Sequence, residues 1–169
     1  MRRLRSGLPV LAAVLLSSAT LAAQQSPPPD CTGQKHRAFD FWLGDWEVTS
    51  NGQVAGTNSI TLAQSGCLLH EHWTSARGGT GESFNFYDRT TDRWHQVWVD
   101  NRGSVLRLSG QPSGDTMRLE GETRGAQGPA QQRITWTRNA DGSVRQLWET
   151  SRDEGGTWTV VFDGHYKRR

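Results

Sequence analysis

Two histidines and a glutamate, consecutive in one predicted strand, are the residues of this chain whose types and spacing could do chemistry. Side chains alternate between the faces of a strand, so His70 and His72 share one face and Glu71 lies on the other. Some zinc enzymes use two histidines in this arrangement, but a site needs a third ligand facing them and an open position. His95 could serve only in a favourable register, and its local sequence gives no support. We therefore expect solvent-facing histidines and no metal site.

Glu71 shares its face with Leu69 and Trp73, which places an acid among apolar groups. If that face is internal, the carboxylate needs a partner such as Arg133 or Arg145, because an isolated buried carboxylate would rather be neutral. If the face is external, Glu71 is simply solvated. The sequence leaves both alternatives open.

Catalytic templates are absent from the sequence, which contains no Gly-x-Ser-x-Gly elbow, phosphate loop or free cysteine–histidine pair. One alternative function remains in the enzyme class, a hydrolase or isomerase that uses Glu71 or Glu149 as a cavity carboxylate. The pattern favours a protein that is not an enzyme, and it implies no cofactor.

Aromatic and amide side chains recur on the predicted strand faces, and the chain contains eight tryptophans. Such faces suit a cavity that stacks a flat ligand and fixes it with a few hydrogen bonds. The alternative is a tryptophan-rich core whose polar members bond to one another. We predict a non-catalytic binder of a small apolar or aromatic molecule, with ligand-binding residues Trp73, Asn85, Gln96, Trp98, Gln146 and Trp148.

Alternating segments separated by turn residues predict the elements that carry these side chains. The expected strands cover residues 45–51, 56–64, 68–76, 82–89, 93–101, 104–110, 115–123, 131–138, 143–151 and 157–167. Strands joined by short turns form an antiparallel meander, and an open sheet of this kind would leave two unpaired edges. Closure into a barrel removes both edges. We predict an all-β fold, a single antiparallel up-and-down β-barrel of about ten strands with a short N-terminal helical turn at residues 36–43. An open sandwich is the alternative.

The segment from Ser151 to Trp158 matches the Asp-box, Ser-x-Asp-x-Gly-x-Thr-Trp, of sialidase-type propellers. Propellers repeat this pattern in every blade, and here it occurs once. We interpret it as a staple of one hairpin, in which Asp153 accepts hydrogen bonds from turn amides.

Residues 1–23 have the basic, apolar and small-residue regions of a signal peptide, residues 24–35 form a linker or arm, and residues 36–169 form the barrel domain. Removal of three arginines with the signal would change the formal charge from +2 to about −1. A clustered basic face for nucleic acid is not expected, nor is an integral membrane span, because the apolar run is short. The predicted location is periplasmic or secreted, where Cys31 and Cys67 would form a disulfide. Oligomeric state stays open.

The segment from Phe39 to Val48, FDFWLGDWEV, begins with a short aromatic turn that leads into a strand through Gly44 and Trp46. It resembles the Gly-x-Trp start of calycin or lipocalin-like barrels, and the wider chain is similar to a domain-of-unknown-function family of small secreted bacterial proteins. This resemblance implies a calycin-like barrel whose closed end is plugged by Trp46. A more distant similarity to nitrobindin-like proteins implies a haem-binding alternative, with His165 as the haem ligand.

Overall fold

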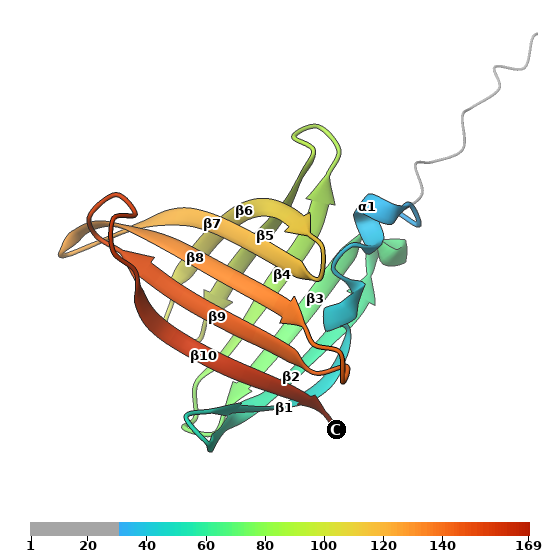
Figure 1. Cartoon of the computed structure of the whole chain (residues 1–169), viewed down its shortest axis with the longest axis horizontal. Coiled ribbons are helices and arrows are strands. Elements are labelled where there is room, and N and C mark those ends of the chain that lie inside the picture. Colours follow the sequence, from blue (N-terminus) through green and yellow to red (C-terminus); the bar gives the residue numbers. More distant parts are fainter. Residues whose placement is uncertain (1–30) are drawn as a thin grey trace, which may run out of the picture.

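Residues 31–169 are described by the computed structural model of the chain. In this region, ten strands form one closed antiparallel barrel in which each strand pairs with the next in sequence and β1 pairs with β10 (Figure 1). The predicted up-and-down barrel is confirmed. The predicted signal peptide, and the linker up to residue 30, lie outside the described residues.

The strand boundaries follow the alternating segments and turn residues of the sequence. Asn51 and Gly52 both have positive φ, 50° and 74°, as the tight turn between the first two strands requires. The strands are β1 (Gly44–Ser50), β2 (Gln53–Ala63), β3 (Leu68–Ser75), β4 (Thr80–Asp88), β5 (Arg93–Asp100), β6 (Val105–Ser113), β7 (Thr116–Gly125), β8 (Gly128–Arg138), β9 (Val144–Ser151) and β10 (Thr159–Arg168).

One end of the barrel, the closed end, is covered by the helix α1 (Gln34–Arg37) and the 3-10 turn η1 (Asp40–Trp42), at the right of Figure 1. Beneath them, Phe39 stacks on Trp42 with ring centroids 5.0 Å apart and meets Trp136 edge-on at 5.1 Å. All three side chains are fully buried. The helical region thus begins at Gln34, two residues before the predicted start of the barrel domain.

The junction of η1 and β1 locks this end to the last strand. Gly44 has φ +129°, a backbone conformation that residues with a side chain rarely adopt, and the Arg168 guanidinium lies where a Cβ would be. That guanidinium lies 4.5 Å from the centroid of the Trp46 ring, in cation–π geometry. Trp46 is fully buried and donates its indole N–H to the Trp42 carbonyl at 2.9 Å.

A disulfide between Cys31 and Cys67 joins the N-terminal arm to the turn before β3, as predicted. The turn contains the 3-10 segment η2 (Gln64–Gly66), whose Gly66 carbonyl also accepts a hydrogen bond from Arg37. The disulfide and this hydrogen bond hold the helical cap together with the Lys35–Asp92 ion pair at 2.6 Å and a hydrogen bond from the Trp94 indole N–H to the Lys35 carbonyl at 3.0 Å.

The Asp-box segment staples the connection between β9 and β10. Asp153 accepts hydrogen bonds from the backbone N–H and the hydroxyl of Thr157, at 2.8 and 2.6 Å, and from the Ser151 hydroxyl at 2.7 Å. These bonds lower the pKa of the Asp153 carboxyl to about 2. Gly155 occupies the positive-φ position at 90°. The interpretation as a single hairpin staple agrees with this geometry.

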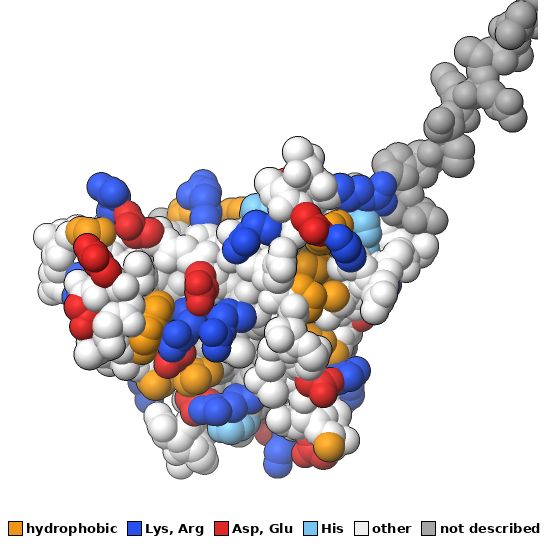
Figure 2. Space-filling model, turned by 45° about the horizontal axis from the view of Figure 1, so that its top comes forward, with side chains coloured by type: hydrophobic (Ala, Val, Ile, Leu, Met, Phe, Trp, Pro, Cys, Tyr) orange, Lys and Arg blue, Asp and Glu red, His pale blue; other side chains and the backbone are white. Residues whose placement is uncertain are grey.

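The outer surface mixes charges of both signs. On the face drawn in Figure 2, Lys and Arg side chains alternate with Asp and Glu, and no large patch of one sign is visible. No helix in the described residues is long and apolar enough to cross a membrane.

Candidate functional site

The half of the barrel interior away from α1 contains a cavity of about 510 Å³. The closed end is filled by aromatic rings, so the cavity opens towards the opposite, open end, where the β1–β2 and β3–β4 connections lie. Its described lining residues are Ser50, Asn51, Gln53, Val54, Ala55, Glu71, Trp73, Ser75, Arg77, Gln96, Trp98, Leu106, Ile134, Gln146, Trp148, Val161, Phe162 and Tyr166. A volume of this size is within the range of small-molecule sites.

Aromatic rings form much of the cavity wall, and glycines on neighbouring strands make room for them. A Cβ at Gly81 would lie 2.2 Å from the Trp98 ring, and one at Gly56 would lie 2.8 Å from the Trp73 ring. Each indole therefore lies against bare backbone of the adjacent strand. Trp73 also meets Phe162 edge-on, with centroids 6.2 Å apart. This packing holds the rings in place before any ligand arrives.

Trp148 completes the aromatic wall from β9. Its indole N–H donates a 2.8 Å hydrogen bond to the amide oxygen of Gln132, which is itself buried. The Gln132 amide nitrogen in turn donates to the hydroxyls of Thr123 and Thr150, at 2.9 and 3.1 Å. The polar edge of Trp148 is therefore satisfied within the barrel wall, and the ring orientation is fixed.

Glu71 points into the barrel and is only 4% exposed, which decides the question that the sequence left open. One carboxylate oxygen accepts a 2.8 Å hydrogen bond from the Asn58 amide, and the other accepts a hydrogen bond from the Ser83 hydroxyl. Burial raises the pKa of Glu71 to about 6, and these two hydrogen bonds oppose the rise. The carboxylate is held by neutral donors.

The arginines suggested as partners of Glu71 lie on the outer face instead. Arg133 pairs with Glu149 at 2.8 Å, and Arg145 pairs with Asp163 at 2.8 Å. In β8 and β9 the even-numbered residues face inwards. Arg133 and Arg145 have odd numbers, so alternation directs both side chains to the outer face, away from Glu71.

The polar groups beside Glu71 form a connected network. Ser83 accepts a 2.8 Å hydrogen bond from the Asn85 amide, and the Asn85 amide oxygen accepts one from Gln96 at 2.9 Å. On the other side, Asn58 contacts the Tyr166 hydroxyl at 3.4 Å. The polar side chains of the interior therefore bond to one another, as expected for the alternative of a tryptophan-rich core. An open cavity nevertheless lies beside this network.

Two glutamines face the cavity with one amide atom each left for a ligand. Gln96 uses its amide nitrogen within the network, and within the described residues its amide oxygen has no hydrogen-bond partner. Gln146 accepts a hydrogen bond from the Tyr166 hydroxyl on its amide oxygen, and its amide nitrogen has no partner in the described part of the chain. These two glutamines therefore offer a ligand an amide oxygen as acceptor and an amide nitrogen as donor.

Five of the six predicted ligand-binding residues line the cavity: Trp73, Gln96, Trp98, Gln146 and Trp148. Asn85 does not. It is fully buried next to Gln96, where it supports the polar network and not the cavity wall. The prediction missed Phe162 and Tyr166, which alternate with Gly164 in β10 and share one face of that strand.

Two residues of the alternative functions lie outside the barrel. Glu149 is ion-paired with Arg133 on the outer face and does not line the cavity. His165 is 55% exposed and lies 3.7 Å from Asp163. Its neighbours in β10, Gly164 and Tyr166, face inwards, so His165 cannot ligate a haem in the cavity. Among the described residues that line the cavity, none is a histidine.

His70 and His72 lie on the outer face of β3, as expected, and both approach Glu82 of β4. Glu82 was not among the predicted candidate ligands. His95, the residue considered as a third ligand, contacts Thr91 at 3.0 Å and stacks on Phe86.

No family model matches this chain, and no curated protein matches it. The geometry of the cavity is therefore the basis for assigning a function.

Proposed function

We propose that this protein binds a small, largely apolar or aromatic molecule in the barrel cavity and does not transform it. One observation carries the proposal: a cavity of about 510 Å³ walled by Trp73, Trp98, Trp148 and Phe162. Small-molecule sites are concave and mostly apolar, with a few convergent polar groups that fix the orientation of the ligand. A dry core would instead leave no cavity between these rings.

The two glutamines indicate the polar character of the ligand. A flat molecule stacked on Trp98 would present its edge to the free amide oxygen of Gln96 and the free amide nitrogen of Gln146. A ligand with one donor and one acceptor on an otherwise apolar body satisfies both groups. Arg77 at the mouth of the cavity adds a positive charge, which suits a ligand whose outer end is anionic.

The contacts of Glu71 favour binding over catalysis. A general acid or base must reach the proton that it transfers, and both oxygens of Glu71 are already engaged by Asn58 and Ser83. Glu149, the other carboxylate considered, lies outside the cavity. The carboxylate of Glu71 thus serves to organise the polar network.

The proposal includes an extracytoplasmic location and membership of the secreted calycin-like family. The Cys31–Cys67 disulfide supports the location, because such bonds persist in oxidising compartments. The placement of Gly44 and Trp46 at the closed end supports the calycin-like assignment. Fractionation of the native host, followed by mass measurement of the mature N-terminus, tests both the location and the predicted cleavage.

Ligand binding is tested first by native mass spectrometry of protein purified from its own host, where an additional mass is expected. A titration with the aromatic dye anilinonaphthalene sulfonate then gives an affinity for a defined probe. Trp98→Ala is expected to weaken dye binding by roughly 1–3 kcal/mol, because it removes one large stacking surface.

Trp158→Ala is the matched control. Trp158 lies in the β9–β10 connection, where the Arg133 guanidinium covers its ring at 3.9 Å, and it does not line the cavity. This variant should bind the dye as the wild type does. Equal losses in both variants, or a featureless mass together with no response to the dye or to a panel of lipids and aromatic compounds, would reject the proposal.

A further inference from the structure

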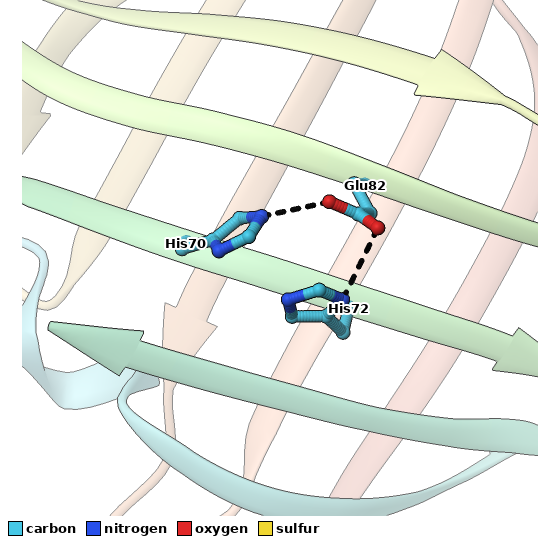
Figure 3. A group of neighbouring side chains, drawn as sticks. All are labelled: His70, His72 and Glu82. Atoms are coloured by element: carbon cyan, nitrogen blue, oxygen red, sulfur yellow. Dashed lines mark hydrogen bonds and ion pairs between the residues drawn. The ribbon is translucent and has the colours of Figure 1, made fainter. Parts of the chain in front are cut away.

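The outer face of strands β3 and β4 brings two histidines and one glutamate together (Figure 3). His70 and His72 are two residues apart in β3 and project to the same side. Glu82 lies directly across from His72 in the register of β3 and β4, so its carboxylate reaches both rings. Its two oxygens lie 2.9 Å from His70 Nε2 and 3.4 Å from His72 Nδ1.

These distances are close to those that a metal ion requires. Tetrahedral zinc has bonds of about 2.0–2.2 Å to nitrogen and oxygen, which places its ligand atoms roughly 3.4 Å apart. The three candidate ligand atoms here all lie within 4.8 Å of one another.

The environment of the three side chains favours a site over a chance ion pair. The His70 ring packs against Phe84 with centroids 4.9 Å apart, and the His70 and His72 rings lie 4.1 Å apart. Two imidazoles converge on one carboxylate, whereas the other histidine–carboxylate contact of the described outer surface, His165 with Asp163, is a single pair at 3.7 Å.

Solvent reaches the three groups. The side chains of His72 and Glu82 are 50% and 56% exposed, and that of His70 is 23% exposed. A groove lined in part by His72, Glu82 and Val99 runs beside them along β4 and β5. A metal ion could enter from solvent, and a position on it would remain open to water or a small ligand.

We propose that His70, His72 and Glu82 form a binding site for one divalent transition-metal ion, with three protein ligands and an open coordination position. Imidazole and carboxylate ligands suit Zn²⁺ and its neighbours in the first transition row, and not Ca²⁺ or Mg²⁺, which prefer all-oxygen sites. Both cysteines of the chain are joined in a disulfide, so thiolate does not compete for the ion. This site is separate from the cavity and does not depend on the proposed function.

Calorimetric titration of the full mature protein with Zn²⁺, without a polyhistidine tag, tests the proposal. We expect about one ion per chain with a dissociation constant on the order of micromolar. His72→Ala and Glu82→Gln should each weaken the affinity at least roughly tenfold. Co²⁺ in place of Zn²⁺ should give the visible absorption bands of a low-coordinate nitrogen and oxygen site in the wild type, and these bands should be lost in both variants.

His165→Ala is the matched control, since it removes an exposed histidine that also lies beside a carboxylate. It should leave the affinity for Zn²⁺ and the Co²⁺ spectrum unchanged. Failure of the wild type to bind Zn²⁺ up to roughly millimolar concentration would overturn the assignment. Equal binding by the wild type, His72→Ala and Glu82→Gln would overturn it as well, because the ion would then be held elsewhere. Circular dichroism of each variant verifies that the barrel is intact.

Discussion

Replacing Glu71 by glutamine should change how the stability of the barrel depends on pH. Glu71 is 4% exposed, and burial raises its pKa from 4.5 to about 6. A rise of that size corresponds to about 2 kcal/mol of unfavourable free energy for the ionised form in the folded state. Glutamine has nearly the same shape and cannot ionise, so this pH-dependent contribution disappears in the variant.

The sign follows from the two protonation states. Above pH 6 the carboxyl is ionised in both the folded and the unfolded chain, and the folded chain bears the full unfavourable contribution. Well below pH 4.5 the carboxyl is protonated in both, and the contribution vanishes. The wild type should therefore gain about 2 kcal/mol of stability relative to Glu71→Gln as the pH falls from about 7 to about 3.5. All other titrating groups are common to both proteins and cancel in the difference.

Urea unfolding followed by tryptophan fluorescence measures this difference at both pH values. Gln132→Leu is the control, because it removes a buried neutral amide from the same interior without removing a titrating group. Its difference from the wild type should not change with pH. At neutral pH alone, Glu71→Gln is less informative, since the new amide cannot accept hydrogen bonds from both Asn58 and Ser83.

A difference between wild type and Glu71→Gln that stays constant within about 0.5 kcal/mol from neutral to acidic pH would refute the reasoning. It would mean that the carboxyl titrates alike in the folded and unfolded chain, and so that the hydrogen bonds from Asn58 and Ser83 fully offset the effect of burial on the pKa.

Three further predictions concern the packing of the barrel. Trp136→Ala should lower the free energy of unfolding by about 3–5 kcal/mol, because the ring is fully buried at the closed end. Trp98→Ala should lower it by only about 1–3 kcal/mol, because its ring borders an open cavity. Chemical denaturation of the two variants measures both values. Replacing Cys31 and Cys67 by serine should lower the free energy of unfolding by about 4 kcal/mol in the chain-entropy model, given their separation of 36 residues; a loss of less than about 1 kcal/mol in urea unfolding would contradict this role. Gly81→Ala should push the Trp98 ring into the cavity, because the new Cβ would lie 2.2 Å from that ring. The affinity for the dye should then fall in a fluorescence titration. An unchanged affinity would show that Gly81 does not fix the position of the ring.

The sequence by itself determined the elements of this protein. Alternation of side chains and turn residues such as Asn51-Gly52 located all ten strands, because the period of a strand and the φ angles of a tight turn are local properties. The disulfide followed from composition, since the chain has two cysteines. Gln96 with Trp98, and Gln146 with Trp148, line the cavity together, because residues two apart in a strand must share a face.

Only the tertiary structure decided which face is internal and which residues meet across strands. Alternation places Glu71 opposite His70 and His72, but it does not say which side faces the core, and barrel closure settled this by burying Glu71. The register of β3 against β4 brought Glu82 to the two histidines, a pairing that depends on the lengths of the intervening strands and turns. The cavity depends in the same way on Gly81, whose missing side chain makes room for a ring of the neighbouring strand. Contacts between residues far apart in sequence are set by the closure of the whole sheet, and no local pattern encodes them.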